Sequence, residues 1–261
     1  MRFPHVLRIF VLMISAYLVA PIVVVMIGAF QESGSFQFPP TALTLQGFAA
    51  FFDSESFVDA FITSILVAAV VATAATVLGG LAAVAIVRFA GRAAAFIEAI
   101  FLAPIVVPGV LLGAALLLLF WRTGVRGTLG ALVAGHLVIA MPYALQTITA
   151  GLIGRGSGLE EAAVSLGATP LQAFCKVTLP LIRSSLISAA VFAFVISFSD
   201  INLALFLSGP LTVTLPMVIF ADISNLGGLP VVAAASTLQI MLVAALLLIF
   251  RGSIWQPVAG R

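Results

Sequence analysis

Residues 157–180 read SGLEEAAVSLGATPLQAFCKVTLP and lie between two long apolar runs. Ser157 is followed three residues later by Glu160, and Thr169 is followed three residues later by Gln172. Each pair predicts a capping box, in which the two side chains bond the free N–H groups at the start of a helix. The stretch therefore predicts two short helices rather than an irregular loop.

The turn between these two helices is predicted at Gly167, since glycine favours the left-handed conformation that closes a helix. Pro170 fits the first position of the second helix, where a missing N–H costs nothing. We therefore expect the polar segment 153–184 to form a helical hairpin that protrudes from a bundle of longer helices.

Apolar runs on both sides of this hairpin are long enough to cross a hydrocarbon core of about 30 Å. Because a lipid-exposed strand leaves its backbone groups without partners, each run is expected to be a helix. The fold class is an all-α membrane protein with one transmembrane domain over residues 1–261. Six spans are expected at about 7–30, 61–87, 94–120, 129–152, 186–207 and 231–250.

The composition supports a lipid-solvated chain. Hydrophobic residues make up 63% of it and charged residues 8%, whereas a soluble protein has about 25% charged residues. The single cysteine, Cys175, excludes an intrachain disulfide framework, and no basic stretch resembles a nucleic-acid surface. The first apolar run exceeds the 7–15 residues typical of a signal peptide, so we interpret it as a retained span.

Basic residues predict the orientation of the spans, because Lys and Arg gather in cytoplasmic loops. With the N-terminus inside, nine basic residues are internal and only Arg122 and Arg126 are external. Both termini and the hairpin are then cytoplasmic. The external segment 31–60 is expected to hold a short interfacial helix with a docking surface, or to be a linker that lies on the bilayer.

The motif Glu161-Ala-Ala-Val-Ser-Leu-Gly167, followed by Val177-Thr-Leu-Pro180, resembles the EAA loop of permease subunits in bacterial ATP-binding-cassette importers. Every fixed position of the pattern is matched, with Val177 where isoleucine is usual. The resemblance implies the type I importer permease fold and an inner-membrane location. It also implies that the hairpin contacts a cytosolic ATPase through Glu160, Glu161, Ala162, Ala163, Gly167, Leu179 and Pro180.

The resemblance further implies a dimer of ATPases that binds ATP and magnesium, a second permease subunit that is a homologue or another copy, and an extracytoplasmic solute-binding protein. No Gly-x-x-x-x-Gly-Lys-Ser/Thr phosphate loop is present, since Val177 follows the only lysine, Lys176. The chain itself is therefore expected to hold no cofactor and no metal, and to catalyse no reaction.

The substrate class is indicated by Ser197-Phe-Ser-Asp200, Phe206-Leu-Ser-Gly-Pro210 and Thr214-Leu-Pro216, which are similar to the second permease of spermidine/putrescine-type importers. That subfamily commonly has an acidic residue where Ser199 stands, so the match to a polyamine substrate is incomplete. Related permeases carry ferric ions, aminoethylphosphonate or other small solutes.

Polar groups at membrane depth are costly and are candidates for function. Ser197, Asp200 and Asn202 in the fifth span are candidates for the translocation path. Asp200 is equally consistent with a hydrated position near the outer interface, or with a bond to a neighbouring helix. His136 in the fourth span is interpreted as an interhelical hydrogen-bonding group.

Glycine and proline in the third and fourth spans give two further expectations. Pro104, Pro108 and Pro142 are expected to kink or locally unwind their helices. Gly109 and Gly113 are expected to permit close helix packing.

Two other classes of function lack the residues that they would require. An ion-coupled secondary transporter that works without an ATPase would suit internal repeats and several buried carboxylates, and neither is evident in the sequence. An intramembrane metalloprotease requires a motif such as His-Glu-x-x-His, which is missing. An aspartyl protease would need two facing acids, and Asp200 is the one plausible candidate within a span.

Overall fold

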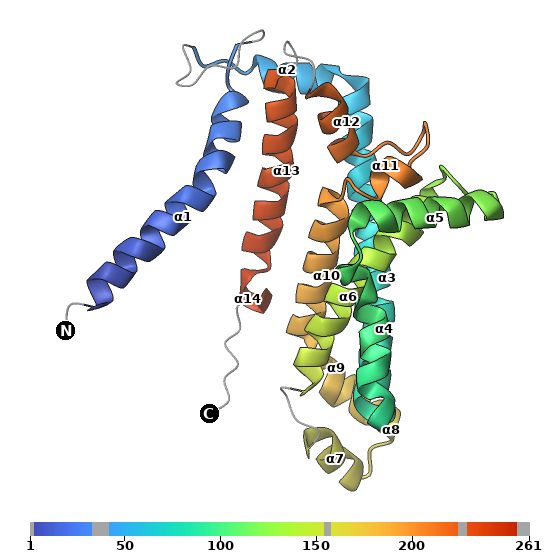
Figure 1. Ribbon diagram of the computed structural model, residues 1–261. Coiled ribbons are helices and arrows are strands. Elements are labelled where there is room, and N and C mark those ends of the chain that lie inside the picture. The colour runs from blue at the N-terminus through green and yellow to red at the C-terminus, as the bar shows by residue number, and fades with distance from the viewer. Residues whose placement is uncertain (1–2, 33–41, 154–157, 224–228, 255–261) are drawn as a thin grey trace. The chain divides into compact units, whose positions relative to one another are not determined.

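The computed structural model describes residues 3–32, 42–153, 158–223 and 229–254, and within these ranges every regular element is a helix. The long helices are α1 (Phe3–Gly28), α3 (Glu55–Phe89), α6 (Leu129–Ile153), α10 (Arg183–Ser199) and α13 (Leu229–Ile249) (Figure 1). The shorter elements are α2 (Gln46–Asp53), η1 (Gly91–Ala93), α4 (Ala94–Val106), α5 (Gly109–Thr123), α7 (Gly158–Ser165), α8 (Pro170–Ala173), η2 (Phe174–Thr178), α9 (Leu179–Leu181), α11 (Ala204–Leu207), α12 (Leu215–Asp222) and α14 (Arg251–Ile254).

The chain divides into two compact units. One contains Met1–Asp59 and Met217–Leu242, and the other contains Ala60–Pro216 and Val243–Arg261. The second unit carries the hairpin and every candidate site residue named above. That all 261 residues form a single transmembrane domain stays a prediction.

The smaller unit joins the segment after α1 to α2 and to the start of α13. Ala29, Ala233 and Ala234 form a buried cluster against which Phe48 packs. The close approach of α2 to the start of α13 requires glycine at position 47, because a Cβ there would lie 2.7 Å from the backbone oxygen of Pro230. The short helix expected within residues 31–60 is therefore present as α2.

The larger unit is organised around α6 and α10, which lie side by side (Figure 1). Leu145 and Ile148 of α6 and Phe198 of α10 are fully buried there. Small residues allow the two helices to approach closely, because a Cβ at Gly151 would overlap the side chain of Ser185. The helices α4 and α14 also pack against this pair, α4 on α6 and α14 on α10.

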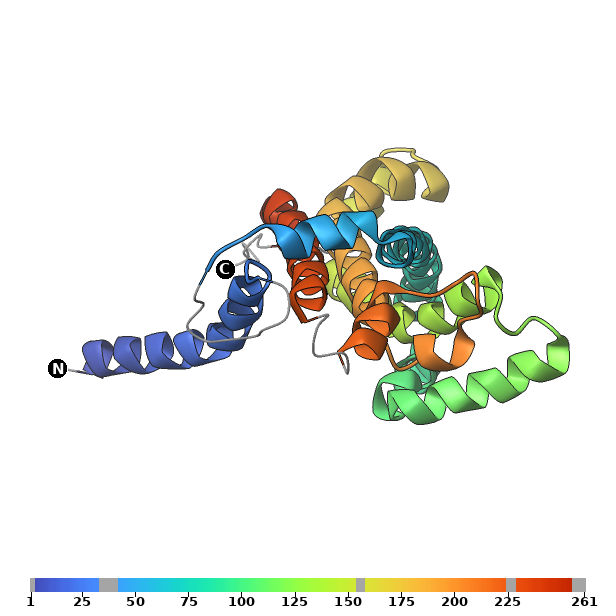
Figure 2. The ribbon, with the colours of Figure 1, turned by 90° about the horizontal axis from the view of Figure 1, so that it is seen from above.

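The third expected span is not one continuous helix. The axes of α4 and α5 differ by 103°, and Figure 2 shows α5 lengthwise as it leaves that bend. Val107 precedes Pro108, a position where steric contact with the proline ring favours extended backbone. Val107 has ψ 128° and Pro108 has ψ 129°, so the helix stops there and restarts at Gly109. Elsewhere α4 continues through Pro104 and α6 continues through Pro142.

The fifth expected span, 186–207, is interrupted as well. Helix α10 ends at Ser199, and Asp200 is extended with ψ 129° before the single turn of α11 begins at Ala204. Within the described residues, four helices are long and apolar enough to cross a bilayer, at Leu7–Gly28, Glu55–Phe89, Leu129–Ile153 and Leu229–Ile249. Two bent pairs, Gly91–Val106 with Gly109–Thr123 and Pro170–Leu181 with Arg183–Ser199, raise the number to six if each pair is one span.

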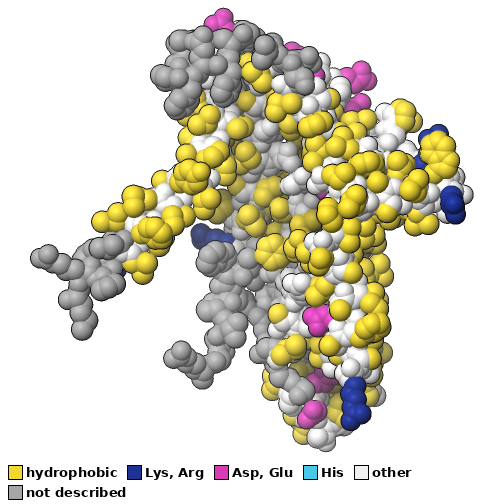
Figure 3. All heavy atoms as spheres, in the orientation of Figure 1, with side chains coloured by type: hydrophobic (Ala, Val, Ile, Leu, Met, Phe, Trp, Pro, Cys, Tyr) yellow, Lys and Arg dark blue, Asp and Glu magenta, His cyan; other side chains and the backbone are white. Residues whose placement is uncertain are grey.

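On the face that Figure 3 draws, the side chains are mostly apolar, and basic side chains lie at the far end of α5 and near the hairpin. Arg126 at the end of α5 stacks on Trp121, with its guanidinium carbon 3.7 Å from the ring centroid. Trp121 is 59% exposed. A tryptophan with basic neighbours is typical of a membrane–water interface, so this end of α5 is suited to that depth.

Candidate functional site

The predicted hairpin is present and closes at the predicted glycine. Helix α7 packs against α8 and η2. Gly167 has φ +95°, its N–H donates to the carbonyl of Val164, and the N–H of Ala168 donates to the carbonyl of Ala163. These two bonds form a Schellman motif, which satisfies carbonyls left free at the end of a helix. The turn is therefore closed by backbone hydrogen bonds, and its left-handed conformation is the reason glycine stands there.

The second helix starts at the predicted capping box. Thr169 Oγ1 accepts from the N–H of Gln172, Gln172 Oε1 accepts from the N–H of Thr169, and Pro170 takes the first helical position. The other predicted box begins at Ser157, which lies outside the described residues.

A π-helix, η2, follows α8 and ends at Thr178, just before Leu179-Pro180. Proline has no N–H to donate, and its ring clashes with the carbonyl four residues earlier. The wider π-turn before Pro180 accommodates both effects. It also directs Thr178 toward α7, since Thr178 is 9% exposed and bonds Glu160.

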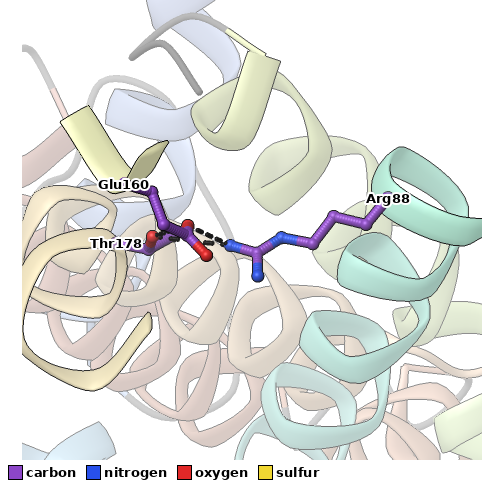
Figure 4. A network of polar contacts seen from close by, with 3 residues as sticks. All are labelled: Arg88, Glu160 and Thr178. Carbon is purple, nitrogen blue, oxygen red and sulfur yellow. Dashed lines mark hydrogen bonds and ion pairs between the residues drawn. The ribbon is translucent and has the colours of Figure 1, made fainter. Parts of the chain in front are cut away.

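Glu160 is held by two residues that are distant in the sequence (Figure 4). Its Oε2 accepts from Arg88 Nη2 at 2.5 Å and also from Thr178 Oγ1. Arg88 Nη2 lies 3.4 Å from Thr178 Oγ1, and the guanidinium carbon lies 5.2 Å from the centroid of the Phe174 ring. The side chains of Arg88 and Glu160 are only 28% and 20% exposed. A cavity of about 600 Å³, with Arg88, Glu160 and Thr178 in its lining, adjoins these bonds.

The structure separates the sequence-predicted hairpin residues into two groups. Glu161, Ala162 and Gly167 are exposed, and so is Leu166, which the sequence did not single out and which is 90% exposed. Ala163 is partly covered, and Leu179 and Pro180 lie at the base of the hairpin on α9. Glu160 instead turns inward to Arg88 and Thr178. These four exposed residues, Glu161, Ala162, Leu166 and Gly167, are defined as the outer surface of the hairpin, and Glu161 also lines the cavity beside Glu160.

A second group of polar residues lies where α10 ends. His136 Nδ1 is 2.9 Å from Ser197 Oγ, and both residues are buried. This bond joins α6 to α10 and confirms that His136 is an interhelical hydrogen-bonding group. The other ring nitrogen, Nε2, lies 3.8 Å from Asp200 Oδ2.

Asp200 lies in the non-helical stretch between α10 and α11. Its Oδ2 accepts from the N–H of Leu203 at 2.8 Å, and its side chain is 10% exposed. Asn202 is exposed beside Gly109, where an added Cβ would lie 3.0 Å from the Asn202 Cβ. Asp200 therefore has a structural role at a helix end, and only Asp200 and Asn202 of the predicted path residues reach the surface.

Glycines on α5 and α6 leave room for the segment 200–207, which packs against both helices. A Cβ at Gly113 of α5 would lie 2.7 Å from Phe206, and a Cβ at Gly135 of α6 would overlap Leu207. The close packing expected of Gly109 and Gly113 is confirmed.

Sequence reasoning missed Arg88 and Thr178 as partners of Glu160. Arg88 bonds a residue that lies 72 positions away in the sequence, beyond the reach of any local motif. Within the described residues, no group of three or more His, Cys, Asp or Glu side chains could hold a metal ion.

Residues 75–256, more than two thirds of the chain, match the model of the family "binding-protein-dependent transport system inner membrane component". The putrescine transport system permease protein PotI of Escherichia coli is 39% identical over 184 residues, which cover 67% of this chain and 64% of PotI. The matched region is thus somewhat less than two thirds of that relative.

Another relative is matched over a larger share of both chains. The spermidine/putrescine transport system permease protein PotC of Haemophilus influenzae is 29% identical, covering 92% of this chain and 93% of PotC. Among solved structures, a bacterial ABC transporter involved in the import of the acidic polysaccharide alginate superimposes with a TM-score of 0.71. That match covers 97% of this chain and 96% of the other at 14% identity, so it shows the fold alone, which is the type I permease fold.

Proposed function

Because this chain belongs to the family of binding-protein-dependent transport system inner membrane components, we propose that it is the membrane-spanning permease subunit of an ATP-driven importer. It would form the translocation path, and a separate ATPase would bind and hydrolyse ATP. The observation that carries the proposal is the exposed outer surface of the hairpin, which lies within the family-matched residues and is closed by backbone hydrogen bonds at Gly167.

The partners follow from the same membership. We propose that an ATPase dimer docks on the hairpin, that a second permease, homologous or identical, completes the path, and that an extracytoplasmic binding protein delivers the solute. A second solved structure, of a bacterial alginate ABC transporter in complex with an alginate pentasaccharide-bound periplasmic protein, supports that third partner. The excess of basic residues in the segments predicted as internal supports an orientation with both termini cytoplasmic.

The substrate class proposed is a small polyamine, because PotI and PotC are named as putrescine and spermidine/putrescine permeases. Asp200 supplies a carboxylate and Asn202 an exposed amide at the α10–α11 interruption, and both are groups that bind ammonium ions. Ser197 would act through its bond to His136 rather than by contact with solute. No observation favours an ion-coupled secondary transporter.

Affinity purification of the tagged full chain from native membranes, followed by mass spectrometry, tests the proposal. We expect an ATPase, a second permease and a binding protein to be recovered. Leu166→Glu should abolish recovery of the ATPase, since a charge at the exposed hairpin turn opposes an apolar contact. The matched control Leu211→Glu, at a residue 94% exposed in the loop between α11 and α12, should retain it. An intact chain recovered alone would contradict the proposal.

A further inference from the structure

The bonds of Glu160 connect three elements of the second unit that are far apart in the sequence. Arg88 lies in the last turn of α3, Glu160 in the first turn of α7, and Thr178 at the end of η2. We propose that these three side chains form a clamp that fixes the hairpin to the end of α3. The inference rests on the proposed function, in which an ATPase docks on that hairpin.

The position of each charge favours the clamp. A cation is favoured at the C-terminal end of a helix and an anion at the N-terminal end. Arg88 and Glu160 occupy those positions in α3 and α7. A single carboxylate oxygen accepts from both the guanidinium and the hydroxyl, so losing any member leaves the other two incompletely bonded. Partial burial of Arg88 and Glu160 reduces the competition from water.

Helix α3 is long enough to connect the clamp at one of its ends with the opposite side of the membrane. With 35 residues at 1.5 Å each, α3 is roughly 50 Å long, well beyond a hydrocarbon core of about 30 Å. Near its other end, the ring centroid of Phe61 lies 6.1 Å from that of Phe198, two residues before Asp200, and Ser64 Oγ accepts from the N–H of Leu215 at the start of α12. A displacement of the hairpin passed to Arg88 would therefore reach, through one helix, the region of Asp200 and Asn202.

Arg88, Glu160 and Thr178 are thus positioning residues that couple movement of the hairpin to the translocation path. Glu161, the neighbouring carboxylate, is exposed, lines the cavity beside the clamp and remains available to the ATPase. This assignment differs from a direct contact between Glu160 and the ATPase, and the two make opposite predictions about ATPase retention.

The test uses the whole importer in proteoliposomes and measures two quantities: retention of the ATPase, and molecules of ATP hydrolysed per putrescine taken up. Arg88→Gln and Glu160→Gln should each retain the ATPase and raise that ratio by about tenfold, within the usual range of coupling factors. Thr178→Val, which keeps the side-chain shape, should raise it less. The control Arg92→Gln removes an exposed charge next to the clamp and should leave the ratio unchanged.

The exchange Arg88→Glu with Glu160→Arg should recover part of the coupling, because the ion pair is restored while the helix-end preferences are reversed. Loss of the ATPase in Glu160→Gln, with retention in Arg88→Gln, would place Glu160 at the ATPase and overturn the clamp. An unchanged ratio in both variants would overturn it too. Failure of the unaltered chain to retain any ATPase would instead refute the proposed function.

Discussion

Ser197 Oγ on α10 lies 2.9 Å from Nδ1 of His136 on α6, and both residues are buried. Replacing Ser197 with alanine leaves a buried imidazole nitrogen without its partner, which costs about 1–3 kcal/mol. We therefore expect Ser197→Ala to lower the free energy of unfolding by that amount, measured by denaturant titration in detergent. The control is Ser199→Ala, at an exposed residue of the same helix, and it should be neutral. Equal stability of the two variants would contradict the importance of the bond.

Asp200 allows a structural role to be separated from a role in transport. Asparagine keeps an oxygen that can accept from the Leu203 N–H, whereas alanine does not. Asp200→Asn should thus preserve stability yet reduce uptake of radiolabelled putrescine by at least about tenfold, the loss expected when a charged partner is removed. Asp200→Ala should reduce both. Normal uptake by Asp200→Asn would leave Asp200 as a helix-end residue only.

Gly167 is a conformational requirement of the hairpin rather than a packing requirement. It has φ +95°, and an added Cβ would meet nothing within 4 Å. Gly167→Ala therefore adds strain of about 1 kcal/mol without a clash. We expect the affinity for the ATPase to fall by about fivefold, the factor for that energy. Gly158→Ala is the matched control, because an added Cβ there also meets nothing within 4 Å and the φ of Gly158 is not positive. The affinity of this variant for the ATPase should be unchanged.

Sequence reasoning was accurate where the signal is local. The effects of Gly167, Thr169 and Pro170 are confined to backbone groups within a few residues of each. Their spacing alone therefore predicts a turn and a helix start. The α4–α5 interruption was partly predictable from Pro108, because Val107 is restricted by its neighbour. Its angle of 103° depends on what α5 packs against, namely α11, and no local rule supplies that.

Sequence reasoning failed where partners are distant or where hydropathy conceals a break. Glu160 bonds Arg88 across 72 residues, so its inward orientation could not be deduced from the motif around it. The run 186–207 is apolar on average despite polar residues at 188, 197, 199, 200 and 202, yet α10 ends at Ser199. Just beyond that end, the side chain of Asp200 accepts from the N–H of Leu203, and one carboxylate contributes little to an average over the run.

The predicted orientation is open to a direct test at Cys175, the only cysteine and an exposed one, on the hairpin. A membrane-impermeant maleimide should label Cys175 in inside-out vesicles and not in intact spheroplasts. Val125→Cys combined with Cys175→Ser moves the thiol to the exposed end of α5 and should reverse the pattern. Labelling of Cys175 in intact spheroplasts would show that the orientation is the reverse of the predicted one.

Uptake by the purified importer in proteoliposomes tests the central claim most directly. A binding protein loaded with radiolabelled putrescine is supplied on one side and ATP on the side of the hairpin, with an ionophore present to remove ion gradients. The account predicts uptake that requires ATP, is unaffected by the ionophore, and disappears in Leu166→Glu. Uptake without ATP that collapses when the ionophore is added would contradict it and identify an ion-coupled transporter.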